Sequence, residues 1–193
     1  MHCGTAVLSI LLAILFENNV YLAAMPGITY NVKLKGIEPY EDIKDPVWLI
    51  TEMKLKKINK THFAINGLYS VLRDNIPTDD LLMSFHAAQK KSNGYQESAL
   101  IQLINKNYCD LWNNEQLIFP TLKKSINATD YKCPPAKGHY AITNYIPDTS
   151  KIPPNVPEGL WKYTFEYFQK DKLVCGYKVY AEVIKESITG GAV

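Results

Sequence analysis

The chain has 193 residues, of which 47% are apolar and 21% are charged, and its net charge is +2. This length suits one domain with its own core, and the composition excludes wholesale disorder. The small charge and the lack of a recognisable nucleic-acid-binding motif argue against a nucleic-acid partner. The 13 tyrosines and three tryptophans favour β-structure, because aromatic side chains pack well on a pleated surface.

Residues 1–24 have the pattern of a secretory signal peptide. The run from Ala6 to Phe16 reads AVLSILLAILF, which is too short to cross a bilayer comfortably but suits the apolar region of a leader. Small residues at Ala23 and Ala24 predict cleavage near that point; a buried helix or an uncleaved anchor is the alternative. No second long apolar run follows. We therefore expect a secreted, extracellular protein with one domain, 25–193, and no stable membrane insertion.

The rest of the chain alternates between apolar and polar residues with a period of two, which is typical of strands with one buried face. Residues 28–36 alternate in this way. The next two alternating segments, 47–58 and 62–72, predict a hairpin with the Asn59 glycosylation sequon at its tip. Further strands are predicted over 81–89, 96–104, from His139 onward, 160–169 and 173–184.

Two connections break the alternation. From Asn107 to Ile126 we expect a short helix or an irregular crossover. Four prolines between Pro147 and Pro157 predict a stiff connection inside the domain rather than a linker. Seven to nine strands without a long helix indicate an all-β fold, a two-sheet antiparallel β-sandwich.

The mature chain would keep three cysteines: Cys109, Cys133 and Cys175. In an oxidising compartment such wide spacing favours a disulfide over a metal site, so no metal or cofactor is expected. A bond between Cys109 and Cys133 would close the irregular segment, whereas the third cysteine stays free, caps something or joins another chain. Cys133 precedes two prolines and no helix N-terminus, which argues against a reactive thiol. Sequons at Asn59 and Asn127 agree with export and are the predicted glycosylation sites.

The C-terminal half contains CPPAKGHYAI, then PPNVPEGLWKYTFEY, and then LVCGYKV. This order resembles the ML (myeloid-differentiation-related lipid-recognition) superfamily. The Lys-Gly step, the PEG turn and the NKT hairpin are similar to the insect-expanded ML-like secreted families that include the CheB chemosensory proteins. The resemblance spans 28–185 and is specific over 133–184. It implies an immunoglobulin-like sandwich whose sheets splay apart around a lipid, with Cys133 paired to Cys109. Cys175 lacks the partner near the mature N-terminus that the family usually has.

A lipid cavity would be lined by alternate residues that face between the sheets. The pattern by itself also fits a filled core, and only the resemblance favours a cavity. Lys123, Lys124, Lys132 and Lys137 flank the irregular segment and would either meet an anionic head group or form an ordinary solvated face. The candidate lining residues are Phe63, Ile65, Tyr69, Met83, Phe85, Leu100, Leu103, Tyr140, Ile142, Tyr163, Phe165, Tyr177 and Val179.

These inferences predict a secreted protein that binds a lipid or a hydrophobic, pheromone-like semiochemical and acts in chemosensation. The alternative is an extracellular accessory protein that binds a receptor or channel and carries no ligand. Enzymatic activity is not expected. His62, His86 and His139 have polar-face parity without a carboxylate at a catalytic spacing, and no nucleophile elbow, zinc-protease motif or phosphate loop occurs.

Overall fold

The computed structural model describes residues 28–60, 62–127, 131–152 and 155–187. The predicted signal peptide, residues 1–24, lies outside these ranges. So do the threonines of both sequons, Thr61 and Thr129, and the side chain of Leu100. No helix in the described ranges is both long and apolar enough to cross a bilayer.

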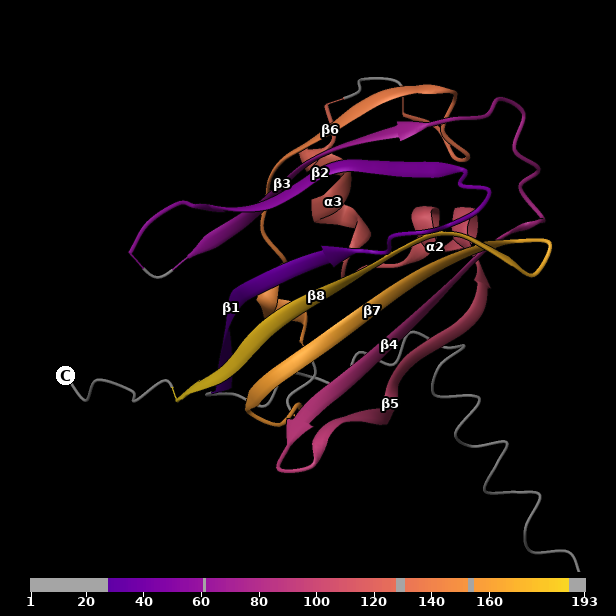
Figure 1. The fold of residues 1–193 in the computed structure, drawn as a ribbon. Helices are drawn as coiled ribbons and strands as arrows, with labels where there is room; N and C mark the ends of the chain where they lie inside the picture. Colours follow the sequence, from indigo (N-terminus) through magenta and orange to yellow (C-terminus); the bar gives the residue numbers. More distant parts are fainter. Residues whose placement is uncertain (1–27, 61, 128–130, 153–154, 188–193) are drawn as a thin grey trace, which may run out of the picture.

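The described chain forms two antiparallel sheets, which confirms the predicted all-β sandwich (Figure 1). The larger sheet has five strands, in the order β1 (Ile28–Pro39), β8 (Lys172–Ser187), β7 (Gly159–Gln169), β4 (Leu81–Lys91) and β5 (Gly94–Asn107). The smaller sheet has three, in the order β2 (Trp48–Lys57), β3 (Phe63–Val71) and β6 (Gly138–Tyr145).

The alternation seen in the sequence sets the buried face of each sheet. On β7 the inward residues Trp161, Phe165 and Tyr167 are buried. On β8 the same face continues through Val179 and Ala181. The predicted hairpin is also present, since β2 pairs with β3 and Asn59 lies exposed in the turn between them.

The crossover between β5 and β6 contains two short helices, α2 (Tyr108–Asn114) and α3 (Phe119–Ser125). The side chain of Asn107 caps α2 by accepting hydrogen bonds from the backbone N–H groups of Cys109 and Asp110, at 2.9 and 3.0 Å. The carboxylate of Glu115 accepts the backbone N–H groups of three consecutive residues at the start of α3: Leu117, Ile118 and Phe119. These two side chains fix the path of a segment that has no periodic pattern of its own.

The two sheets contact each other mainly along β1, which packs against β2 and β3. β2 also contacts β8, and Trp48 on β2 packs edge-on against Tyr167 on β7. Elsewhere the crossover lies between the layers, since α2 packs on β4 and β5 while α3 packs on β6 (Figure 1). The sandwich is therefore closed by strands along one edge and by helices along the other.

A disulfide between Cys109 and Cys133 anchors this crossover. It joins the start of α2 to the segment that leads into β6, and it links residues 24 positions apart whose Cα atoms lie 5.4 Å from each other. The predicted pairing is thus present, and Cys175 is buried and unbonded.

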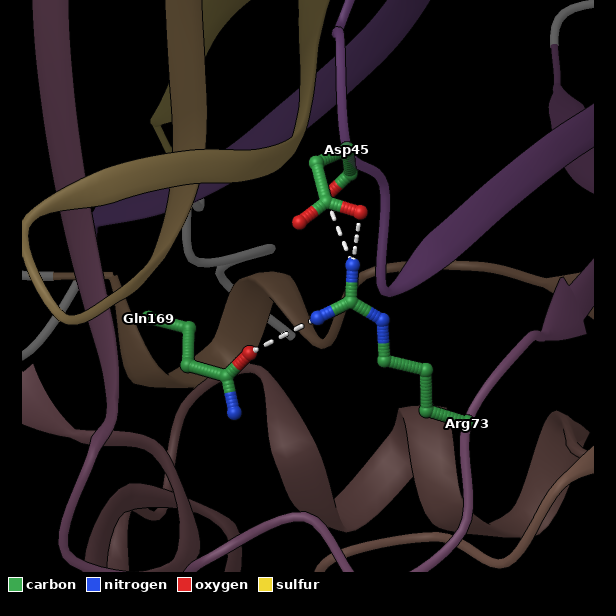
Figure 2. A network of polar contacts seen from close by, with 3 residues as sticks. All are labelled: Asp45, Arg73 and Gln169. Atoms are coloured by element: carbon green, nitrogen blue, oxygen red, sulfur yellow. Dashed lines mark hydrogen bonds and ion pairs between the residues drawn. The ribbon is translucent and has the colours of Figure 1, made fainter.

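An exposed polar cluster connects the sheets at one end of the sandwich. Figure 2 shows the Arg73 guanidinium, just after β3, between Asp45 and Gln169. It forms an ion pair with the Asp45 carboxylate, and its Nη1 donates to Oε1 of Gln169, the last residue of β7, at 3.4 Å. Because the Asp45 side chain is 69% exposed, this ion pair contributes at most about 1 kcal/mol.

Replacing both Cys109 and Cys133 by alanine should lower the free energy of unfolding by about 3 kcal/mol, because the unfolded chain then loses the constraint of a closed loop of this length. Equilibrium denaturation in urea measures the change. As a control, a reductant should lower the midpoint of the wild type and leave that of the double variant unchanged. A loss below about 1 kcal/mol would mean that packing alone holds the crossover.

Candidate functional site

A cavity of about 170 Å³ lies between the two sheets. Both sheets contribute to it, together with the crossover and the segment around the short helix η1 (Thr149–Lys151). Its walls are formed by Val32, Leu34, Ile37, Met53, Ile65, Phe85, Leu117, Ile118, Leu122, Ile142, Tyr145, Pro147, Asp148, Ile152, Tyr163, Phe165, Tyr177, Val179 and Ala181. We call this space the main cavity.

The walls of the main cavity are almost entirely aliphatic or aromatic. Asp148 is the one charged residue among the described residues that form them. Its carboxylate accepts hydrogen bonds from Ser150, from N at 3.0 Å and from Oγ at 2.6 Å. These hydrogen bonds hold the pKa of the Asp148 carboxyl below its usual value, with a smaller contribution from Lys151 and Lys124. The carboxylate is therefore ionised at neutral pH.

Asp148 marks one end of the main cavity, where the η1 segment approaches the turn between α2 and α3. The Nζ of Lys151 donates to the carbonyl oxygen of Gln116 at 2.9 Å, a bond that connects these two segments. Leu117 and Ile118, held by the Glu115 carboxylate, line the cavity from the turn.

A smaller chamber of about 80 Å³ adjoins the main cavity and shares four wall residues with it, namely Met53, Leu122, Ile142 and Tyr177. We call it the inner chamber. Its remaining walls are Trp48, Ile50, Tyr69, Tyr108, Ile126, Tyr131, Tyr167 and Cys175. Five tyrosines, an indole and a thiol thus surround a space much smaller than the main cavity.

The tyrosine hydroxyls of the inner chamber interact with one another. The Oη atoms of Tyr167 and Tyr177 lie 3.3 Å apart. The hydroxyl of Tyr131 also influences the pKa of Tyr69 and that of Tyr108. Burial raises the pKa of all five hydroxyls well above the usual 10.0. The chamber therefore contains neutral phenols.

The thiol of Cys175 lines the inner chamber but is not a nucleophile. Burial raises the pKa of this thiol to about 12, so the thiolate is negligible at neutral pH. The side chain acts as a small apolar residue in the wall. This accounts for a cysteine that has no disulfide partner.

Met53, between the two chambers, lies against β3 because residue 67 is glycine. A Cβ at Gly67 would lie 2.5 Å from Sδ of Met53 and 3.0 Å from the carbonyl oxygen of Glu52. The close approach keeps the thioether at the boundary between the chambers. Methionine has three rotatable bonds, so this boundary can change shape.

The structure brings eight of the predicted lining residues to these spaces. Tyr69 lines the inner chamber. Seven line the main cavity: Ile65, Phe85, Ile142, Tyr163, Phe165, Tyr177 and Val179.

Four other predicted residues line neither space. Met83 is fully buried in the packed core, and Phe63 and Tyr140 pack against that core. Leu103 is half-buried on β5, the strand at the edge of the five-stranded sheet. A side chain that faces inward does not always line the cavity. Leu103 does not, because β5 is at the far edge of the large sheet, where no strand of the small sheet lies opposite.

Other wall residues were not among the predicted lining. Val32 and Leu34 belong to the alternating segment 28–36, but period-two alternation does not reveal that β1 pairs with β8 and so reaches the main cavity, as Ile37 also does. Leu117 and Ile118 come from the non-periodic crossover, so no face could be assigned to them.

The three histidines of the described chain lie away from the cavity. His139 on β6 places Nδ1 2.8 Å from Oγ of Ser70, and His86 on β4 places Nε2 3.9 Å from the Glu166 carboxylate on β7. Each of these contacts joins two neighbouring strands. The spacing of residues along the sequence therefore did not show the Glu166 carboxylate beside His86. Within the described ranges no three His, Cys, Asp or Glu residues are grouped as in a metal site.

These features define the class of protein as a β-sandwich with an apolar cavity between its sheets. A family described as "Protein of unknown function (DUF1091)" matches residues 83–163. The matched stretch runs from β4 into β7 and includes the crossover with both cysteines of the disulfide. No curated protein matches the chain.

Raising the pH above 10 should unfold the protein cooperatively. Burial raises the pKa of Tyr145 and Tyr163 to about 12, whereas an unfolded tyrosine ionises near 10.0. Stability is complete below pH 10 and falls as the pH rises toward 12, because only the unfolded chain releases these protons there. Each of the two tyrosines should remove about 2–3 kcal/mol by pH 12.

Ultraviolet titration of tyrosinate, followed together with near-ultraviolet circular dichroism, tests this expectation. The buried tyrosines should ionise in one step that coincides with loss of tertiary structure. In denaturant, all tyrosines should titrate near pH 10, which provides the control. Smooth ionisation of every tyrosine near pH 10 with the fold intact would contradict the burial seen here.

Proposed function

We propose that this protein is a secreted binding protein that carries a lipid or another apolar small molecule in the main cavity. The observation that carries the proposal is the cavity itself, with about 170 Å³ of space and one charged residue in its described walls. Water gains few hydrogen bonds in such surroundings, whereas an apolar molecule that enters them is removed from water at about 25 cal/mol per Å² of its surface. Binding of a hydrocarbon is therefore favourable without a charged anchor.

The size of the cavity narrows the ligand class. An engineered protein cavity of about 150 Å³ lined by aliphatic and aromatic residues stays dry and binds benzene. Drug-sized ligands occupy pockets of about 300–1,000 Å³. A cavity of about 170 Å³ therefore suits a single hydrocarbon chain or a small volatile molecule, and a sterol would require the sheets to separate further.

The resemblance to the ML superfamily supports the same function. The chain shares with it the Cys-Pro pair that follows the crossover and the last strand that carries a cysteine. A two-sheet sandwich held by a disulfide at the crossover is compatible with this relationship and with an extracellular location. From the similarity to CheB-like families we further propose a role in chemosensation, with a hydrophobic semiochemical as the ligand.

An accessory protein that binds a receptor remains the second candidate. The outer side of the three-stranded sheet carries Leu49 and Leu68, which are 46% and 47% exposed, with Leu72 just beyond β3 at 37%. Exposed leucines grouped in this way are suited to contact with another protein. These residues and the cavity lie on opposite faces of the same sheet, so contact with a receptor would not require a ligand in the cavity.

Blocking the cavity tests the proposal. Ile142 lines both spaces and is half-buried, so the Ile142→Trp variant should fill the boundary between them. The affinity for an apolar fluorescent probe such as N-phenylnaphthylamine should fall about tenfold or more, equivalent to about 1.4 kcal/mol. Native mass spectrometry of protein secreted from a eukaryotic host should show a lipid-sized adduct on the wild type only.

Thr143→Trp is the matched control, because Thr143 is the next residue of β6 and is exposed. This variant should bind the probe as the wild type does, and thermal denaturation should show that both variants are folded. Equal binding by the two variants, or a wild type that binds no probe and carries no adduct, would exclude the carrier function and favour the accessory role.

A further inference from the structure

The three-stranded sheet carries most of the exposed apolar side chains of this protein. Seven large apolar side chains are markedly exposed within the described ranges, and five of them lie on this sheet or directly after one of its strands. They are Leu49, Ile58, Leu68, Leu72 and Ile146. Exposed apolar residues grouped in this way mark a surface that contacts a partner molecule or a membrane.

The strand register shows that the leucines point outward together. Leu49 of β2 pairs with Ser70 of β3, two residues beyond Leu68, so the two leucines share a face. Their chain neighbours Ile50 and Tyr69 line the inner chamber. Because successive side chains of a strand point to opposite faces, Leu49 and Leu68 point away from the interior.

Lysines extend the same outward face toward the turn between β2 and β3. Lys54 follows Met53, which lines the main cavity, so Lys54 points outward, and Lys56 shares its parity on β2. Both lysines are exposed. Two more exposed lysines follow, Lys57 at the end of β2 and Lys60 in the turn.

The charge of this sheet is one-sided. Its three strands and the β2–β3 turn contain four lysines and a single carboxylate, that of Glu52, whereas the whole chain has a net charge of only +2. The Glu52 carboxylate forms an ion pair with Lys54, and both side chains are exposed. The excess of positive charge is therefore local to this sheet, and it attracts an anionic surface.

The residue types on this face match a lipid bilayer better than a protein partner. Protein interfaces are enriched in arginine and aromatic residues and depleted in lysine. The outward positions of β2 and β3 instead carry leucine, lysine and small or polar residues. The nearby Arg73 is engaged with Asp45 and Gln169 (Figure 2). Anionic lipid head groups attract lysines, and exposed leucines enter the boundary between head groups and acyl chains.

Two other occupants fit this face less well. A second copy of the chain is disfavoured, because two such faces in contact would bring the four lysines of each copy together. The predicted glycan on Asn59 would lie in the β2–β3 turn. Leu68 and Leu49 are about 20 and about 30 Å from that turn along the strands, so the glycan would leave them accessible.

We propose that the outer face of the three-stranded sheet docks reversibly on a membrane surface that contains anionic lipid. Leu49, Leu68 and Leu72 enter the boundary between head groups and acyl chains, while Lys54 and Lys56 contact the anionic head groups. The inference goes beyond the carrier function and does not require an occupied cavity. It places the main cavity, on the inner face of the same sheet, close to a source of apolar molecules.

Vesicle flotation of the protein secreted from a eukaryotic host tests the inference. One set of vesicles consists of phosphatidylcholine alone, and the other also contains about 30% phosphatidylserine. The wild type should bind the anionic vesicles about tenfold more tightly than the neutral ones. Raising NaCl from about 0.1 to about 0.5 M should weaken this binding about tenfold, because salt screens exposed charges. These measurements need no variant.

Two charge variants locate the contact. The Lys54→Gln/Lys56→Gln variant should bind anionic vesicles about tenfold more weakly than the wild type. The matched control is Lys91→Gln/Lys106→Gln, which removes the same charge from exposed positions of the five-stranded sheet. This control should bind as the wild type does.

Two apolar variants test the leucines in the same way. The Leu49→Ser/Leu68→Ser variant should also bind about tenfold more weakly, because less apolar surface enters the bilayer. Its control is Ile104→Ser/Leu160→Ser, which changes two similarly exposed apolar residues of the five-stranded sheet and should leave binding unchanged. Thermal denaturation shows whether each variant is folded.

The outcomes separate this inference from the carrier function. A wild type that floats with neither kind of vesicle, or with both equally, would overturn the inference. Equal weakening by the variants of the two sheets would also overturn it, because binding would then not depend on this face. If the wild type binds N-phenylnaphthylamine but no vesicle, the carrier function stands and a receptor protein becomes the better partner for this face. If it binds vesicles but not the probe, the carrier function fails and the membrane contact is retained.

Discussion

The crossover between β5 and β6 is the constraint on which the interior of this protein depends. Two sheets with facing apolar surfaces pack about 10 Å apart and interdigitate their side chains. Here the main contact between the sheets is that of β1 with β2 and β3, while α2 packs on β4 and β5 and α3 packs on β6. Because the disulfide and the Glu115 carboxylate hold the helices in that place, the sheets cannot close upon each other. The space left over is the main cavity.

The cavity is local and is not a sign of loose packing. At the opposite end from the disulfide, Trp161, Ala87 and Val183 are 1–2% exposed and form a filled cluster. Leu81 and Val47 are fully buried elsewhere in the core. The packing defect is therefore confined to the region between the sheets where the crossover lies. This contrast supports the carrier proposal more strongly than the apolar lining alone.

Buried polar atoms are nearly always hydrogen-bonded, and this explains where polar groups lie inside the sandwich. Several buried tyrosines place their hydroxyls together at the inner chamber, where those of Tyr167 and Tyr177 interact. The Nε1 of Trp161 donates to the carbonyl oxygen of Pro157 at 2.9 Å. Trp48 Nε1 has no such acceptor among the described residues.

The sequence alone determined the strands, because alternation with a period of two is a local property: the β2–β3 hairpin, the aromatic face of β7 and the inward face of β8 all follow from it. It also indicated the disulfide, since Cys109 and Cys133 bracket a long segment that lacks a period. Only the tertiary structure decided that β1 lies beside β8 and that Leu117 and Ile118 turn inward, because strand order and helix docking depend on contacts between distant residues. The same limit applies to the cavity. Alternation shows which side chains face the interior, but whether the opposing side chains meet there depends on the distance between the sheets, which the crossover sets.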